Sequence, residues 1–77
     1  MNRDRDLKPV EQAVLRYGRG QRLKADAFTH AILRALDTAD ELQRQGLEAL
    51  FPEIFAAWTA WRSGELAKRE QAIGGAR

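Results

Sequence analysis

Few residues in the chain could perform catalysis. Ser63 is the only serine, His30 is the only histidine, and cysteine is absent from the 77 residues. A serine or cysteine nucleophile needs a base within reach, and nothing in the sequence brings Ser63 and His30 together. Helical periodicity places His30 on a polar stripe, where we expect a solvated or weakly paired side chain. We therefore predict no catalytic residue and no enzyme activity.

The acidic residues offer no clearer chemistry. Asp37, Asp40 and Glu41 are close in sequence, but carboxylates on a helix surface are ordinary. An acid–base pair needs a cleft that shifts the pKa values of its members, and so small a chain has little room for one. One histidine without cysteine also falls short of the ligands that a structural zinc site uses. We predict no metal site and no cofactor.

The stretch from Arg16 to Lys24 gathers positive charge around one aromatic ring and two glycines. Its candidate nucleic-acid-binding residues are Arg16, Tyr17, Arg19, Arg22 and Lys24. In one interpretation the cations clamp phosphates while the tyrosine stacks on a base, as in single-strand and RNA binders. In the other, the stretch is a turn between two helices with solvated side chains. A small nucleic-acid-binding regulator is therefore the alternative functional hypothesis.

Residues 47–61 form the most apolar part of the chain and contain both tryptophans. Helical spacing divides them into two adjacent seams, which is more apolar surface than one partner helix can cover. The candidate partner-binding residues are Phe51, Phe55, Trp58 and Trp61. Either both seams build a minimal core, completed in a homodimer, or a tryptophan anchors a partner at the surface, where tryptophan is enriched in binding hot spots.

One long helix is predicted to organise the fold. Its apolar face comprises Ala25, Phe28, Ile32, Ala35, Ala39 and Leu42, widened by Leu33 and Leu36. The opposite stripe is polar and comprises Asp26, His30, Arg34, Asp37, Glu41 and Arg44. Thr38 and Glu41 have the spacing of a capping box, so a second helix could begin there. Because the apolar stripe crosses that point without a change of phase, we favour one helix.

The sequence predicts an all-α fold of three helices, roughly 7–18, 22–45 and 52–73. The two longer helices form an antiparallel hairpin, and the short first helix lies across it. Either Asp6 caps the first helix, which then begins at Leu7, or Pro9 occupies its first position. Pro52 suits the start of the last helix, and Gly18 suits the end of the first. Gly64 leaves open a break in the last helix, since glycine in a helix costs only about 1 kcal/mol. We expect one domain over residues 1–77, with flexible ends at 1–6 and 74–77.

Charge and size point to association. Residues 1–24 carry seven Lys/Arg and three Asp/Glu, whereas residues 25–61 carry two and six. Such asymmetry is typical of a polyanion-binding end or of complementary faces between two protomers. A domain this small is marginally stable alone, and without disulfides or metal a homodimer is the common solution. No apolar run is long enough to span a membrane, so we expect a cytoplasmic protein.

The first functional hypothesis is a non-enzymatic regulator or inhibitor that binds a larger protein partner through its aromatic helical surface. By size and composition alone, the chain resembles small helical regulators of this kind. The alternative, nucleic-acid binding through the basic stretch, would not use a groove-reading helix. The second helix would present Asp26 and Asp37 outward, and acidic side chains are wrong for a groove lined with phosphates.

Overall fold

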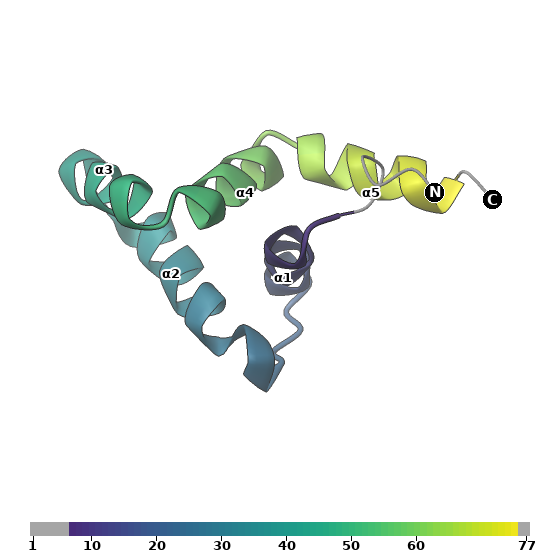
Figure 1. The fold of residues 1–77 in the computed structure, drawn as a ribbon, viewed down its shortest axis with the longest axis horizontal. Helices are drawn as coiled ribbons and strands as arrows, with labels where there is room; N and C mark the ends of the chain where they lie inside the picture. The colour runs from purple at the N-terminus through teal and green to yellow at the C-terminus, as the bar shows by residue number, and fades with distance from the viewer. Residues whose placement is uncertain (1–6, 76–77) are drawn as a thin grey trace.

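The predicted all-α fold is confirmed. The computed structural model describes residues 7–75, with side chains as far as Ile73, and these residues contain no strand. The helices are α1 (Pro9–Gly18), a 3-10 turn η2 (Lys24–Asp26), α2 (Ala27–Thr38), α3 (Glu41–Leu50), α4 (Pro52–Arg62) and α5 (Glu65–Gly75). Helices α2 and α4 diverge from α3, α1 lies in the opening between them, and α5 extends from the far end of α4 (Figure 1). None of these helices combines the length and the apolar character needed to cross a membrane.

Both prolines start helices, Pro52 as predicted and Pro9 two residues after the predicted bound at residue 7. Pro9 and Pro52 are the first residues of α1 and α4, where a missing backbone N–H costs nothing. At the start of α1 the backbone N–H of Lys8 donates to Oε1 of Glu11, at 2.9 Å. Gly18 ends α1 as expected. Flexible ends were predicted at 1–6 and 74–77; residues 1–6 and 76–77 lie outside the described residues, whereas Gly74 and Gly75 belong to α5.

The prediction of a single helix over 22–45 is wrong, because the chain breaks at Ala39. Ala39 has an extended backbone (φ −73°, ψ 146°), and Asp40 begins a new helix. The Oδ1 of Asp40 accepts from the backbone N–H of Gln43 at 2.7 Å, and the Gln43 side chain accepts from the Asp40 N–H at 3.0 Å. This reciprocal box satisfies two backbone donors at the start of α3. It lies two residues beyond the Thr38–Glu41 spacing that the sequence suggested.

The predicted helix over 52–73 is also divided. Gly64 separates α4 from α5 with φ +85°, a left-handed conformation that glycine adopts without steric cost. Together the two breaks replace three helices by five, and the predicted hairpin of two long helices by a shorter α2 and α4 joined through α3.

The buried face of α2 differs from the predicted one. Leu33 and Leu36 are fully buried, and His30 and Asp26, which the helical period placed on the polar stripe, are buried as well. Phe28 and Leu42, from the predicted apolar face, are exposed instead. The reason is that α1 supplies polar partners. Nε2 of His30 lies 2.9 Å from the carbonyl oxygen of Ala13, and Arg16 pairs with Asp26, so both polar groups can be buried at low cost.

The core is small, and α3 reaches it only through the half-buried Leu47. Its buried members are Val14, Leu15, Leu33, Leu36, Ile54, Ala57, Trp58 and Leu66, which come from α1, α2, α4 and α5. Helix α3 contributes no buried residue, although it packs beside α2 and α4. Its apolar side chains are therefore left largely in solvent.

Candidate functional site

The four aromatic residues predicted to bind a partner do not share one surface. Trp58 belongs to the core, where it is 5% exposed and its Nε1–H donates to Oδ1 of Asp37 at 3.0 Å. The guanidinium groups of Arg44 and Arg62 lie 5.3 and 5.1 Å from its ring. Trp58 thus has partners for both its ring and its N–H within the chain.

The other three aromatic residues are half-buried at separate places. Trp61 packs edge-on against Tyr17, with ring centroids 5.9 Å apart, and helps hold α1 to α4. Phe55 lies beside Trp58, at 5.8 Å. Phe51 meets Phe28 edge-on at 5.5 Å. Among these ring contacts of the described residues, the one made by Phe51 reaches a large exposed apolar side chain, Phe28.

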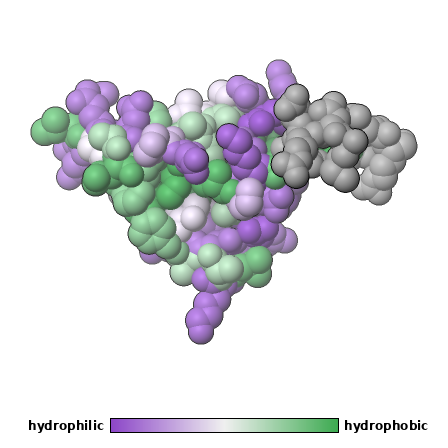
Figure 2. Space-filling model, in the orientation of Figure 1, coloured by the Kyte–Doolittle hydropathy of each residue, from purple (hydrophilic) through white to green (hydrophobic). Residues whose placement is uncertain are grey.

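That exposed side chain belongs to an apolar surface that the sequence did not assign to binding. Phe28 is 61% exposed, Leu42 77% and Leu50 73%. Together with Phe51, these side chains define what we call the α2–α3 face. A hydrophobic band runs over α3 and down the outer side of α2 (Figure 2). Helical spacing in the sequence already grouped Phe28 and Leu42 on one apolar face. That face was expected to be buried in the core, so it was not predicted as a binding surface.

The α2–α3 face includes a groove between its two helices. The groove has a volume of about 440 Å³ and is lined by Ala35, Thr38, Ala39, Gln43, Gly46, Leu47 and Leu50. Gly46 adds to its width, because a Cβ built there would meet no atom within 4 Å. The lining combines small residues with the exposed Leu50, and its volume is enough for a branched or aromatic side chain.

The helix that carries these leucines is acidic. Three exposed carboxylates lie on α3 or cap its start, Asp40, Glu41 and Glu48, and a fourth, Glu53, lies in the first turn of α4. The only cation between residues 40 and 53 is Arg44, and its guanidinium is occupied over the Trp58 ring and by the carbonyl oxygen of Ala39, at 3.3 Å. The α2–α3 face thus combines apolar contacts with a negative field.

The predicted basic stretch separates into paired and unpaired cations. Nε and Nη2 of Arg16 donate to the two carboxylate oxygens of Asp26, at 2.6 and 2.9 Å, and Arg19 pairs with Glu70. Both arginines therefore tie elements of the fold together. Among residues 7–73, no ion pair involves Arg22 or Lys24.

The unpaired cations surround a hollow between α1 and α2. It has a volume of about 540 Å³ and is lined by Tyr17, Arg22, Leu23, Lys24, Ala27, His30, Ala31 and Arg34. Arg22 lies over the Tyr17 ring, 5.2 Å from its centroid. The sequence prediction missed Arg34 here, although Ala27, Ala31 and Arg34 share a helix face by their spacing.

Tyr17 is held in place at one wall of this hollow. Its hydroxyl donates to Oδ2 of Asp37 at 2.8 Å, and its ring meets His30 edge-on at 5.4 Å. Burial raises the pKa of the Tyr17 hydroxyl, and the hydrogen bond to Asp37 raises it further. The phenol therefore stays protonated and keeps donating well above neutral pH.

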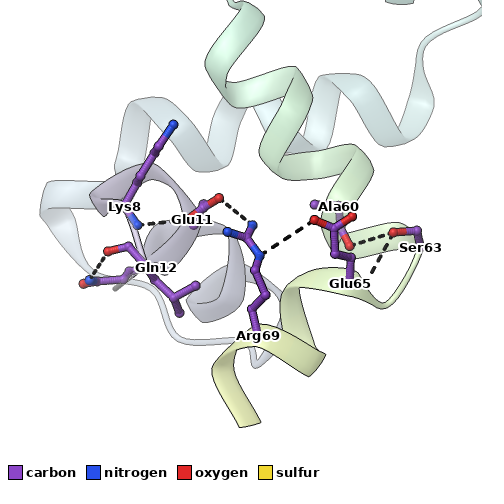
Figure 3. Close-up of polar contacts among 8 residues, drawn as sticks. Lys8, Glu11, Gln12, Ala60, Ser63, Glu65 and Arg69 are labelled. Carbon is purple, nitrogen blue, oxygen red and sulfur yellow. Dashed lines mark hydrogen bonds and ion pairs between the residues drawn. The ribbon is translucent and has the colours of Figure 1, made fainter. Parts of the chain in front are cut away.

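Polar contacts also fasten α1 to α5 (Figure 3). Nη2 of Arg69 donates to Oε2 of Glu11 at 2.6 Å, and its Nε lies 3.8 Å from Oε2 of Glu65. Burial acts to raise the pKa of the Glu11 carboxyl, but hydrogen bonds from the Lys8 N–H and from Arg69 outweigh it, so this pKa lies below its ordinary value. The hydrogen bonds from Arg16 likewise lower the pKa of Asp26.

Ser63 and His30, the two residues considered for nucleophilic catalysis, lie in different parts of the described structure. The Ser63 hydroxyl donates to the carbonyl oxygen of Ala60 at 3.0 Å, in the turn between α4 and α5. His30 lies in α2 against α1, where Nε2 faces Ala13 and is 3.6 Å from Oδ2 of Asp26. Residues 7–75 contain no cluster of three or more potential metal ligands.

Comparisons of the chain with models of protein families, with curated proteins and with solved structures find no match.

Proposed function

We propose that the chain is a small non-enzymatic regulator that binds a larger protein partner through the α2–α3 face. The exposure of Phe28, Leu42 and Leu50 on adjacent helices carries this proposal. Contiguous apolar surface of this kind is costly in water and marks interaction sites on soluble proteins. Of the aromatic residues predicted as anchors, Phe51 belongs to this face, whereas the partners of Trp58 and Trp61 lie within the chain.

The partner would present an apolar side chain to the groove beside Gly46, flanked by basic residues that complement the carboxylates of α3. Opposite charge across an interface speeds association and discriminates among partners. The predicted homodimer would cover the same face, but symmetric pairing brings the same patch of each copy together. Two acidic α3 helices would then meet. This repulsion favours a different, basic partner as the occupant.

The proposal is tested with Leu42→Asp, and Leu23→Asp is its matched control. Leu23 is 51% exposed and lies between α1 and η2, outside the residues that define the α2–α3 face. Because both leucines are exposed, both variants should keep the helical circular dichroism of the parent. Tagged chains are used to retrieve the partner from native cells, and its affinity is then measured with the purified pair.

Leu42→Asp should weaken binding at least tenfold, which corresponds to about 1.4 kcal/mol, while Leu23→Asp should change it less than twofold. Equal losses in the two variants would contradict the assignment of the face. Sedimentation at micromolar concentration is the second measurement. A dimer that Leu42→Asp dissociates would show that the face joins two copies of this chain, against the proposed larger partner.

A further inference from the structure

We propose that the hollow between α1 and α2 is a binding site for a nucleoside phosphate. This site shares no residue with the α2–α3 face, so the inference does not rest on the proposed function. It develops the prediction of a basic nucleic-acid-binding stretch with a specific cavity and a different set of residues.

The first argument is charge. Three cations line the hollow, Arg22, Lys24 and Arg34, and its lining includes no Asp or Glu. Within the part of the chain that the structure describes, none of the three takes part in an ion pair. The neighbouring Arg16 and Arg19 are instead neutralised by acidic partners. Uncompensated positive charge around a concave surface concentrates anions there.

The second argument is size. A volume of about 540 Å³ is in the range of small-molecule sites, roughly 300–1,000 Å³, and exceeds what one inorganic phosphate needs. Leu23, Ala27 and Ala31 provide apolar lining between the cations. The ligand that fits therefore has an anionic group and a larger body with apolar faces.

The third argument is the planar group at the wall. The Arg22 guanidinium lies over the Tyr17 ring, and a guanidinium plane stacks well on a nucleobase. Tyr17 is fixed by Asp37, by His30 and by Trp61. This side of the hollow is thus ordered before any ligand arrives, which reduces the entropy lost on binding. A base against Arg22 would leave its phosphate to Lys24 and Arg34.

A nucleoside phosphate could come from a free nucleotide or from a single-stranded nucleic acid. The test uses four probes with the full chain: inorganic phosphate, adenosine, adenosine monophosphate and a short single-stranded oligonucleotide. Binding is measured by isothermal titration calorimetry at 50 and 200 mM salt. Adenosine monophosphate should bind at least fivefold more tightly than either inorganic phosphate or adenosine, and salt should weaken it. If the oligonucleotide binds more tightly than adenosine monophosphate, the natural ligand is a single-stranded nucleic acid. If it binds equally or more weakly, the natural ligand is a free nucleotide.

Lys24→Gln and Arg34→Gln should each weaken binding at least fivefold. The matched control is Lys68→Gln, which removes the same charge from an exposed position on α5 and should change affinity less than twofold. Ala31→Glu, which places a carboxylate in the hollow, is a second variant, and Ala72→Glu on α5 is its control. Three results would overturn the proposal: no heat with any probe at millimolar concentration, phosphate binding as tightly as the nucleotide, or equal weakening by Lys24→Gln and Lys68→Gln.

Discussion

Asp26 and His30 show how two polar side chains can determine which face of a helix is buried. Hydrophobic periodicity treats every polar residue as outward, but both of these are buried against α1. They can be buried because Arg16 and the carbonyl oxygen of Ala13 provide matching groups from another helix. Burial of polar groups is inexpensive only when such partners exist. The pairing joins residues ten or more positions apart, so local spacing could not reveal it.

Two glycines at the surface of different helices should respond oppositely to alanine. A Cβ at Gly18 would lie 2.7 Å from Nε1 of Trp61, so Gly18→Ala must displace the indole and should cost about 1–3 kcal/mol of unfolding free energy. At Gly46 the space is open, so Gly46→Ala should stabilise α3 by about 0.5–1 kcal/mol. Urea denaturation measures both. A stabilising Gly18→Ala would contradict the close packing of α1 against Trp61.

At the scale of the helices, the sequence predicted the ends that depend on proline and missed those that depend on competition between caps. Pro9 and Pro52 fix helix starts by their own covalent geometry. The break at Ala39 depends on whether Thr38 or Asp40 caps the better helix, and periodicity cannot decide that because it continues across the break. The candidate site was located in part. Phe51, Tyr17, Arg22 and Lys24 were predicted as binding residues and lie on the two surfaces, while Phe28, Leu42, Leu50 and Arg34 were assigned other roles.

The cap at α3 can be tested by comparing two neighbouring positions. Asp40→Ala removes the acceptor for the Gln43 N–H and should lower stability by about 1 kcal/mol, the usual value of an N-cap. The hydroxyl of Thr38 donates only to the carbonyl oxygens of Arg34 and Ala35 in its own helix. Thr38→Ala should therefore lower the stability much less than Asp40→Ala. Thermal unfolding followed by circular dichroism ranks the two. The reverse order would mean that the helix begins at the Thr38 box after all.

For the whole molecule, the short helix α1 has the role that the sequence assigned to the long second helix. Helix α1 packs against α2, α4 and α5, and its polar side chains reach Asp26, Asp37, Arg69 and Glu70. Because α3 adds no buried residue, the few core side chains of the other helices must be supplemented by these contacts. A chain whose small core depends on ion pairs should be sensitive to acid.

The acid response follows from the pKa values of Glu11 and Asp26, both of which are lowered in the folded state. A carboxyl with a lowered pKa binds fewer protons when folded than when unfolded. Its contribution to the free energy of unfolding is therefore complete above the pKa of the same group in the unfolded chain, roughly 3.9 for Asp and 4.3 for Glu. This contribution is lost as the pH falls through the pKa of the folded state. We expect the free energy of unfolding to decline below about pH 4 for this reason.

Asp26→Asn isolates this contribution. The variant should be less stable than the parent at pH 7, because Arg16 loses its charged partner, and the difference should shrink as pH falls from 5 to 2 and the parent's carboxylate is protonated. Glu48→Gln is the control, since Glu48 is exposed on α3 and forms no ion pair among the described residues. Its stability should follow the parent at every pH. Urea denaturation monitored by tryptophan fluorescence reports both variants. A difference for Asp26→Asn that stays constant with pH would mean that the Arg16–Asp26 pair stabilises the fold by shape rather than by charge.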